Sequence, residues 1–427
     1  MNRLSIKKIA KVTNGKSDVK DALVDGKYLF FDRSSFVKRS NKYLFDSEAI
    51  IIPGEDSRQI FEPRYYFGKF NLHQRCYVIY DLEEDYSTKF LFYKLKTLTK
   101  HFANVNVGST VPSLRLDHIT DLNVDFPSFE NQKAIAKVLS DLDTKIEVNK
   151  KINVELEEMA QTIYEYWFVQ FDFPDFNGKP FKASGGKMVY NENLKKEIPE
   201  GWQDKTIADW IENDKSGDWG KEFAQGNYTE QVSCIRGADI NGLNGNGEVK
   251  APERFILEKN THKLLEEGDL IIEISGGSPT QSTGRMAFMT QETLERFENP
   301  LICSNFCKAV TLKDETYLYN FVYQWQRLYD AGVLFGWEGK TSGIKNLLFE
   351  SFVTNYNTVF PKKDIVEKFY QKIKPIHAKK QKNLRENQKL ADLRDWLLPM
   401  LMNGQVTVKE AQEHINQAAE PQEVYKK

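Results

Sequence analysis

Two short motifs contain residue types that hold phosphate or metal ions in enzymes. Gly339-Lys340-Thr341 matches the end of a phosphate-binding loop, but Leu334 stands where that loop needs an earlier glycine. Pro174-Asp175 and Glu248-Val249-Lys250 contain the carboxylates and the lysine of one nuclease type, yet they are far apart in the chain. We therefore expect neither a nucleotide site nor a nuclease site at these motifs.

The other residue types that are typical of catalysis or metal binding are not arranged for it either. The sequence has no Asn/Asp-Pro-Pro-aromatic tetrad of the kind found in adenine methyltransferases. Its four cysteines contain no CxxC pair, and its six histidines contain no pair at helical spacing. We expect reduced cysteines, no metal site and no catalytic residue in this chain.

Basic and polar side chains beside predicted strands form a different pattern. The net charge of the 427-residue chain is −2, but residues 1–127 have 20 Lys and Arg against 16 Asp and Glu. Arg and Lys bind DNA phosphates, and Arg, Gln and Asn can hydrogen-bond to base edges. The candidate DNA-contacting residues in this part are Lys38, Arg39, Lys42, Arg58, Arg64, Tyr65, Lys69 and Arg75. The candidates in the second half are Arg236, Ser278, Gln281, Ser282, Arg285, Lys340 and Lys345. For each residue the alternative is an ordinary solvated surface side chain.

The elements that would carry these side chains occur twice along the chain. Shifts of 221, 231 and 234 residues superimpose landmarks that keep their order. The matching landmarks are Ile50-Ile51 with Ile271-Ile272, Cys76 with Cys307, Phe126-Pro127 with Phe360-Pro361, Asn149 with Asn383, and Asn153 with Asn387. We interpret the chain as two copies of one unit, each a globular domain followed by a long helix.

Short apolar runs predict mixed α and β structure in both globular domains. Ala49–Ile52, Cys76–Tyr80 and Leu270–Ile274 have the length and composition of strands. Lys89–Leu98 has the apolar spacing of a helix. We expect the α+β class, with two domains of similar fold.

Both predicted long helices have an apolar stripe whose members alternate steps of four and three, as in a coiled coil. The stripe residues are Ile135, Leu139, Leu142, Ile146, Asn149, Asn153 and Leu156 in the first helix, and Asn383, Asn387 and Leu390 in the second. The second stripe also contains Lys380 and Arg394. Pro375 lies within it, so we expect a kink or a restart of the helix there.

The asparagines and the charges favour an antiparallel pair. In that arrangement Asn149 and Asn153 would face Asn387 and Asn383, which fixes the register because a mispaired buried amide is costly. Residues 128–168 have 5 basic and 8 acidic side chains, whereas residues 362–395 have 11 and 5, so the helices have opposite charge. The alternative is two independent amphipathic helices.

Several motifs resemble the specificity subunits of type I restriction–modification systems. Glu130, Gln132, Ile135, Ala136 and Leu139 match the start of that family's central helix, with Asn131 inserted between the Glu and the Gln. GSTVPSL at 108–114 is similar to the turn that closes a target-recognition domain. GKP, SGGKMV and IPEGW in the connector, and LRDWLLPMLMNGQV at 393–406, are also similar to family segments. The second domain departs from the pattern at 339–343 and at the GGSPTQST loop, 276–283, which leaves its base-contacting residues undefined.

The resemblance implies the fold divisions and the partners. We expect a first target-recognition domain at 1–127, a spacer helix at 128–170, a connector at 171–201, a second target-recognition domain at 202–360, a second spacer helix at 361–402 and a C-terminal tail at 403–427. Two antiparallel coiled-coil helices would separate the domains with pseudo-twofold symmetry and would dock two modification subunits. Restriction subunits would also join.

The resemblance further implies that each domain recognises one half of a split, asymmetric sequence in double-stranded DNA. The partner subunits would use S-adenosylmethionine, ATP and Mg²⁺, and this chain would bind no cofactor itself. We also expect a cytoplasmic protein without a membrane segment, because no apolar run is long enough to cross a bilayer. A coiled-coil scaffold protein and a standalone nuclease or methyltransferase are the competing hypotheses.

Overall fold

The computed structural model describes residues 2–108, 111–278, 280–341 and 343–419. The chain divides into two units: unit 1 is Met1–Ile146 with Gln388–Lys427, and unit 2 is Glu147–Asn387. The division falls inside two long helices, α4 (Phe129–Tyr164) and α9 (Lys363–Asn403), so each unit contains a part of both. Helices and strands are mixed in both units, in agreement with the predicted class.

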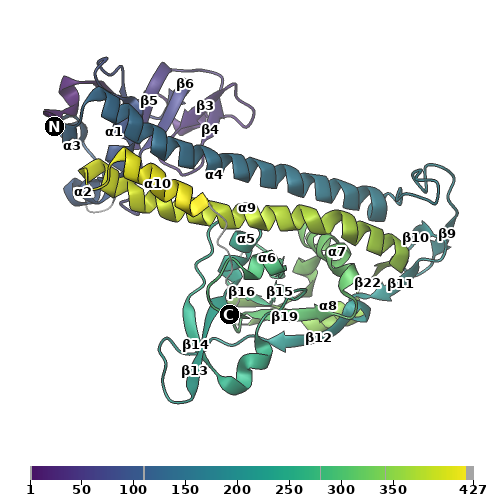
Figure 1. Cartoon of the computed structure of the whole chain (residues 1–427). Helices are drawn as coiled ribbons and strands as arrows, with labels where there is room; N and C mark the ends of the chain where they lie inside the picture. Colours follow the sequence, from purple (N-terminus) through teal and green to yellow (C-terminus); the bar gives the residue numbers. More distant parts are fainter. Residues whose placement is uncertain (1, 109–110, 279, 342, 420–427) are drawn as a thin grey trace. The chain divides into compact units, whose positions relative to one another are not determined.

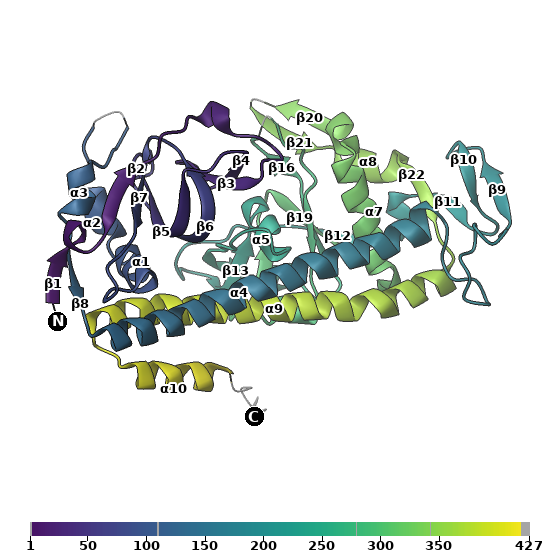
Figure 2. The same ribbon diagram turned by 90° about the horizontal axis from the view of Figure 1, so that it is seen from above.

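Unit 1 is built around a six-stranded sheet with the order β2-β7-β5-β6-β3-β4 (Figures 1 and 2). Its strands are β2 (Lys11–Asn14), β3 (Tyr28–Phe31), β4 (Lys38–Ser40), β5 (Phe45–Pro53), β6 (Arg64–Leu72) and β7 (Cys76–Tyr80). All neighbours are antiparallel except β3 and β6. A separate antiparallel pair joins β1 (Asn2–Ser5) to β8 (Asn123–Phe126).

Both faces of this sheet are buried, which explains the continuous apolar run in β5. Ile50 and Ile52 belong to one core cluster with Leu139 of α4, whereas Ile51 belongs to a second cluster with Phe70. Successive side chains of a strand point to opposite faces, so one run supplies both clusters. The short helices of unit 1 are α1 (Thr88–Lys96), α2 (Thr99–Val105) and α3 (Leu116–Thr120).

Unit 2 has a four-stranded antiparallel sheet with the order β12-β19-β15-β17. A second sheet has the order β14-β13-β18, and a third the order β16-β21-β20. The strands are β12 (Ile211–Ser216), β13 (Tyr228–Ile235), β14 (Glu253–Leu257), β15 (Leu270–Glu273), β16 (Ser275–Gly276), β17 (Met286–Phe288), β18 (Leu301–Cys303), β19 (Cys307–Leu312), β20 (Glu338–Thr341) and β21 (Ile344–Leu347). Two-stranded pairs join β9 (Met188–Asn191) to β10 (Lys196–Pro199), and β11 (Gln203–Thr206) to β22 (Asn357–Phe360). The helices are α5 (Ile240–Leu243), α6 (Gln291–Leu294), α7 (Leu318–Asp330) and α8 (Phe349–Asn355).

The two units share a run of four strands in the same spatial order. In unit 1 this run is β2-β7-β5-β6, and in unit 2 it is β12-β19-β15-β17. The repeated landmarks fall at matching places, because β7 and β19 begin at Cys76 and Cys307, and β8 and β22 end at Phe126 and Phe360. The correspondence found in the sequence is therefore also a correspondence of strand topology.

Within unit 2 the parts of α4 and α9 lie side by side and run in opposite directions (Figures 1 and 2). Asn149 Nδ2 donates to Asn387 Oδ1 at 2.9 Å, and Asn383 Nδ2 donates to Asn153 Oδ1 at 2.8 Å. All four amides are buried. The predicted pairing of the asparagines is confirmed.

The two basic residues that interrupt the second stripe each have an acidic partner on α4. In unit 2 the largely buried Lys380 pairs with Glu157, and Tyr323 of α7 hydrogen-bonds both Glu157 and His377. In unit 1 Arg394 pairs with Asp143 at 2.8 Å. These contacts explain how cations fit on an otherwise apolar face, since a buried charge needs a partner.

The expected restart of the second helix at Pro375 needs correction. Helix α9 continues without interruption through Pro375, so no restart occurs there. Pro375 and Gln371 are exposed, so water can bond the Gln371 carbonyl that the proline leaves without a helical donor.

The predicted C-terminal tail contains a helix, α10 (Val408–Ala419). Thr407 and Glu410 cap its first turn, and Ala411 is buried in the core of unit 1. Residues 420–427 lie outside the described part of the chain. None of the helices in the described ranges is long and apolar enough to cross a membrane.

Candidate nucleic-acid interface

A tight turn in unit 1 brings together three segments that are distant in the sequence. We call it site 1 and define it as residues 54–55 and 73–76. The His73 N–H donates to the Phe31 carbonyl at the end of β3, and the Gly54 N–H, just after β5, donates to the Arg75 carbonyl, both at 2.9 Å. The turn itself is closed by the Cys76 N–H, which donates to the His73 carbonyl at 2.9 Å.

Unit 2 contains the same backbone arrangement. We call it site 2 and define it as residues 274–275 and 304–307. Three hydrogen bonds reproduce those of site 1: Ser304 N–H to the Ile235 carbonyl (2.8 Å), Cys307 N–H to the Ser304 carbonyl (2.9 Å) and Ile274 N–H to the Phe306 carbonyl (2.9 Å). Arg75 and Phe306 therefore occupy equivalent positions, and so do Glu55 and Ser275.

A hairpin closes each site in the same way. The Leu114 N–H donates to the Gly54 carbonyl at 2.8 Å, and the Leu347 N–H donates to the Ile274 carbonyl at 2.8 Å. The predicted turn at 108–114 belongs to the first hairpin, although Ser109 and Thr110 lie outside the described residues. The predicted departure at 339–343 lies in the second hairpin, between β20 and β21, and Ser342 there is likewise not described.

Site 1 presents an arginine cluster, which consists of Arg33, Glu55 and Arg75. Arg75 Nη1 binds Glu55 Oε1 at 2.6 Å, and Arg33 Nη1 binds Glu55 Oε2. The Glu55 side chain is 15% exposed, whereas those of Arg33 and Arg75 are 40% and 55% exposed. Burial alone would raise the pKa of the Glu55 carboxyl, but the bonds and charges of Arg75 and Arg33 outweigh it and lower that pKa.

Site 2 presents an apolar cleft instead. Its volume is about 610 Å³, and Trp219, Phe306 and Ile344 are the large apolar side chains in its wall. Phe306 is half exposed, and the Arg254 guanidinium stacks on the Trp219 ring at 4.4 Å. Arg236 also lines the cleft, where it forms an ion pair with the buried Asp239 at 2.8 Å.

Several predicted DNA-contacting residues of unit 1 make internal contacts. Lys38 Nζ binds the buried Asp32 at 2.6 Å, and Arg64 Nη2 donates to the Ser34 carbonyl. The Tyr65 hydroxyl donates to Glu48, and burial together with this bond raises its pKa. The exposed candidates are Arg39, Lys42, Arg58, Lys69 and Arg75.

The structure brings some of these candidates together. Arg58 and Arg64 line a cleft of about 310 Å³ beside Arg33 of the arginine cluster. Lys69 lies over the Tyr43 ring at 4.9 Å, and Arg39 donates to the Gly26 carbonyl at 2.6 Å. Arg58, in the loop before β6, and Arg64, at the start of β6, therefore lie near the arginine cluster.

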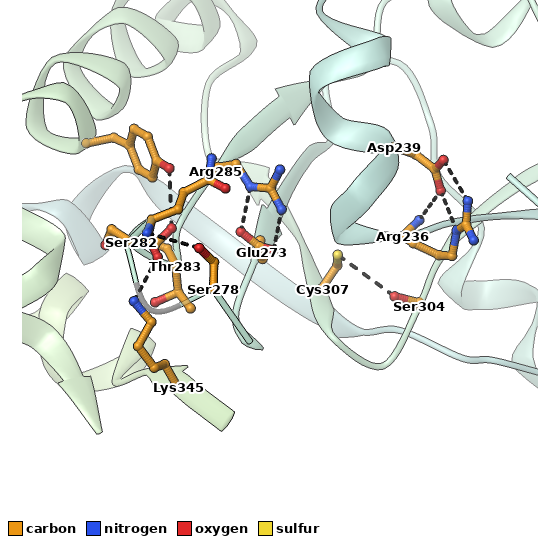
Figure 3. A network of polar contacts seen from close by, with 12 residues as sticks. Arg236, Asp239, Glu273, Ser278, Ser282, Thr283, Arg285, Ser304, Cys307 and Lys345 are labelled. Carbon is orange, nitrogen blue, oxygen red and sulfur yellow. Dashed lines mark hydrogen bonds and ion pairs between the residues drawn. The ribbon is translucent and has the colours of Figure 1, made fainter. Parts of the chain in front are cut away.

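In unit 2 the predicted Arg285 lies in a largely buried ion pair (Figure 3). Its Nε and Nη2 atoms bind the two carboxylate oxygens of Glu273 at 2.8 and 2.6 Å. The hydrogen bonds from Glu273 raise the pKa of Arg285 above its ordinary value. This bidentate geometry is the strongest form of an arginine–carboxylate contact.

Ser278, Gln281 and Ser282 lie in the loop between β16 and β17, and Lys345 contacts it (Figure 3). Lys345 Nζ binds the Gln281 carbonyl at 2.7 Å and Glu338 at 3.2 Å. Ser282 is buried against the same Glu338, and the Ser278 hydroxyl accepts from the Gln281 N–H at 3.2 Å. Lys340 pairs with Lys345 across the β20–β21 ladder, and its side chain is not among those described.

The sequence patterns did not indicate four residues in or beside the two sites. They are Glu55 in site 1 with Arg33 bound to it, and Phe306 in site 2 with Trp219 in the same cleft. The shift of 231 that moves Cys76 onto Cys307 also moves Arg75 onto Phe306, so the repeat contained the information needed to find Phe306. For Glu55 and Arg33 no local pattern was available, because the turn joins ends of three different strands.

Comparison with known proteins finds similar sequences and a similar fold. The family model "Type I restriction modification DNA specificity domain" matches residues 1–158. The type I restriction enzyme MjaIX specificity subunit of Methanocaldococcus jannaschii is 26% identical over 333 residues, which cover 76% of this chain and 70% of that protein. This chain is a homologue of type I restriction enzyme specificity subunits. The predicted family resemblance is confirmed.

Two further similar proteins are also specificity subunits of type I systems. The Escherichia coli EcoDI specificity subunit is 30% identical over 226 residues, which cover 49% of this chain and 47% of that protein. The crystal structure of a type I restriction–modification S subunit from M. genitalium matches with a TM-score of 0.60 at 16% identity, over 94% of this chain and 95% of that one. That likeness supports the fold. The residues that match the family model, 1–158, include all of site 1.

Proposed function

We propose that this chain recognises a split, asymmetric sequence in double-stranded DNA, with one half-site bound by each unit. The observation that carries the proposal is the matching backbone of sites 1 and 2, which the same hydrogen bonds and the same hairpin closure hold in both units. The side chains at equivalent positions differ in chemistry. Two similar scaffolds with different surfaces suit two half-sites of different sequence.

The DNA-contacting surface of each unit, in this proposal, is the area around its site. In unit 1 it includes the arginine cluster together with the exposed Arg39, Lys42, Arg58 and Lys69. In unit 2 it includes the cleft of site 2, Arg236 and the loop that contains Ser278 and Gln281. Ser282, Arg285 and Lys345 stabilise that loop through their internal bonds, and their contribution to DNA binding would be indirect.

We assign α4 and α9 the role of a coiled-coil framework with a pseudo-twofold relation between its two copies. The asparagine contacts support this, because Asn149 and Asn383 are equivalent in the repeat and each bonds the other copy's second asparagine. The stripe side chains are buried or half-buried. They would hold the helices together, and a partner protein would contact the opposite faces.

The proposed partners are two modification subunits, which would methylate adenine with S-adenosylmethionine, and restriction subunits that use ATP and Mg²⁺. In this scheme the chain itself is not an enzyme and binds no cofactor. Its known homologues carry the name of specificity subunits, which supports that assignment.

Mapping of methylated adenines tests the proposal. Cells would express this chain together with a type I modification subunit, and sequencing would locate the methylated sites. We expect one motif with two defined halves and a fixed gap, and no methylation when this chain is omitted. A single continuous short motif would overturn the split target.

Two further measurements separate the competing hypotheses. DNA affinity of the assembled complex should fall steeply as salt rises, because cations are released from DNA phosphates on binding. A coiled-coil scaffold protein would show no such DNA affinity. Methyl transfer or cleavage by the purified chain alone would contradict a non-catalytic role.

A further inference from the structure

We propose that the arginine cluster of site 1 recognises a guanine in the major groove, and that Arg75 makes the base contact while Glu55 fixes its orientation. This inference rests on the proposed function, and it adds which residue contacts a base and which base that residue recognises. The cluster belongs to unit 1 alone, so it concerns one half-site.

The position of the cluster is set by backbone contacts. Arg75 lies in the turn that three backbone hydrogen bonds hold. One of them joins the Gly54 N–H to the Arg75 carbonyl, and it places Glu55 directly beside Arg75. Arg33 follows β3, whose last residue, Phe31, binds the same turn through its carbonyl. Side chains held by a rigid scaffold keep the geometry that a base contact requires.

The three side chains differ in their exposure to solvent. The carboxylate is the most buried member, and the two guanidinium groups are much more exposed. Two cations around one anion leave the cluster with a net charge of +1. The exposed groups of the cluster are therefore mainly its two cations, although the carboxylate of Asp18 also acts on Arg75.

The hydrogen-bonding capacity of Arg75 is only partly used. Among the described residues, its side chain contacts Glu55 through Nη1 at 2.6 Å, and a guanidinium has five N–H groups in a planar fork. Guanine presents two acceptors, O6 and N7, on its major-groove edge, and an arginine fork matches both. A guanidinium that a carboxylate already orients loses less conformational freedom when it binds.

A phosphate contact is the main alternative for Arg75. Phosphates accept hydrogen bonds from many directions, so such a contact needs no fixed fork, and Arg58 and Lys69 of the same unit are exposed to make it. For a phosphate contact, the ion pair between Arg75 and Glu55 would be unnecessary, and the negative charge of Glu55 would weaken the attraction of Arg75 to the phosphate. The presence of Glu55 favours the guanine contact.

The test uses the assembled complex and maps the methylated motif for five variants, of which Phe306→Ala lies in site 2. Arg75→Lys retains the charge but loses the fork, and Arg75→Ala loses both. Glu55→Gln retains the shape but loses the carboxylate. The matched control is Lys11→Ala, which removes one cation from an exposed ion pair with Asp81 in the same unit.

We expect one half of the wild-type motif to contain a guanine that Arg75→Lys and Arg75→Ala relax by roughly 5- to 150-fold, the range of one bidentate contact. Glu55→Gln should relax the same position by a smaller factor. The other half of the motif should remain unchanged, and Lys11→Ala should leave both halves unchanged. Phe306→Ala in site 2 should not affect the guanine position.

Two outcomes would overturn the inference. An unchanged motif with weaker binding at every sequence, and a smaller salt dependence, would make Arg75 a phosphate contact. An unchanged motif with unchanged affinity would make the cluster purely structural. In both cases a wild-type motif with two halves would leave the proposed function intact, whereas wild-type complex without a defined motif would contradict the proposed function itself.

Discussion

Sites 1 and 2 have one backbone and two surfaces. Each turn is held by three corresponding hydrogen bonds, yet Arg75 in one stands where Phe306 stands in the other, and Glu55 corresponds to Ser275. The inward-facing Cys76 and Cys307 are the same residue type and are both fully buried. Although the buried His73 and Ser304 also differ, the cysteine in the core is retained while the exposed residue changes from Arg75 to Phe306. This is the distribution expected of a scaffold whose exposed residues determine what it binds.

The glycines opposite the two turns offer the strongest test of that equivalence. A Cβ atom on Gly15 would lie 2.2 Å from the Leu72 carbonyl oxygen, and one on Gly217 would lie 2.0 Å from that of Ser304. Neither backbone can move without breaking its turn. Gly15→Ala and Gly217→Ala should each destabilise the protein by about 1–3 kcal/mol or more. Calorimetric unfolding would measure both effects.

A suitable control for these variants is Gly336→Ala. No atom lies within 4 Å of a Cβ at Gly336, so this substitution should have little effect on unfolding. If one of the two turn glycines tolerated alanine as well as Gly336 does, the turns would not be structurally equivalent.

The two carboxylates beside the sites should differ in their contribution to stability. Glu273 in unit 2 is 5% exposed and holds the largely buried Arg285, whereas Glu55 in unit 1 holds two arginines that are well exposed. Loss of one partner from a buried pair costs about 3–5 kcal/mol, and exposed pairs contribute about 1 kcal/mol or less. In chemical denaturation, Glu273→Ala should therefore lower the unfolding free energy far more than Glu55→Ala. Equal losses would contradict the contrast between a carboxylate whose arginine partner is largely buried and one whose arginine partners are exposed.

The sequence predicted the framework of the two units better than their surfaces. The strand around Ile50 and its copy around Ile271, the two long helices and the asparagine pairs all follow from local spacing, and the structure confirms them. Helix α10 was missed although Thr407 and Glu410 have the spacing of a capping box, because residues 403–427 were interpreted as a tail.

The partners of charged side chains could not be predicted, because they come from other strands. Lys38 and Arg285 were chosen as DNA-contacting candidates on their type and position alone. In the structure Asp32 and Glu273 bind them. A local pattern finds a cation, but the fold decides which anion lies beside it. The arginine cluster has the same origin, since its three members come from the ends of three segments.

A small pH effect should also separate the two sites. Because the folded pKa of Glu55 is lowered by Arg75 and Arg33, its charge stabilises the folded state above the unfolded pKa, which is roughly 4.3. That contribution is lost as the pH falls through the folded pKa. Wild type should therefore be slightly more stable than Glu55→Gln at neutral pH, and the difference should vanish in acid. Ser275 at the equivalent position of site 2 does not titrate, so any stability difference caused by Ser275→Ala should not depend on pH. Thermal unfolding of both variants across this pH range would measure the two differences. A Glu55→Gln difference that persists in strong acid would show that the carboxylate charge does not hold the arginines of site 1.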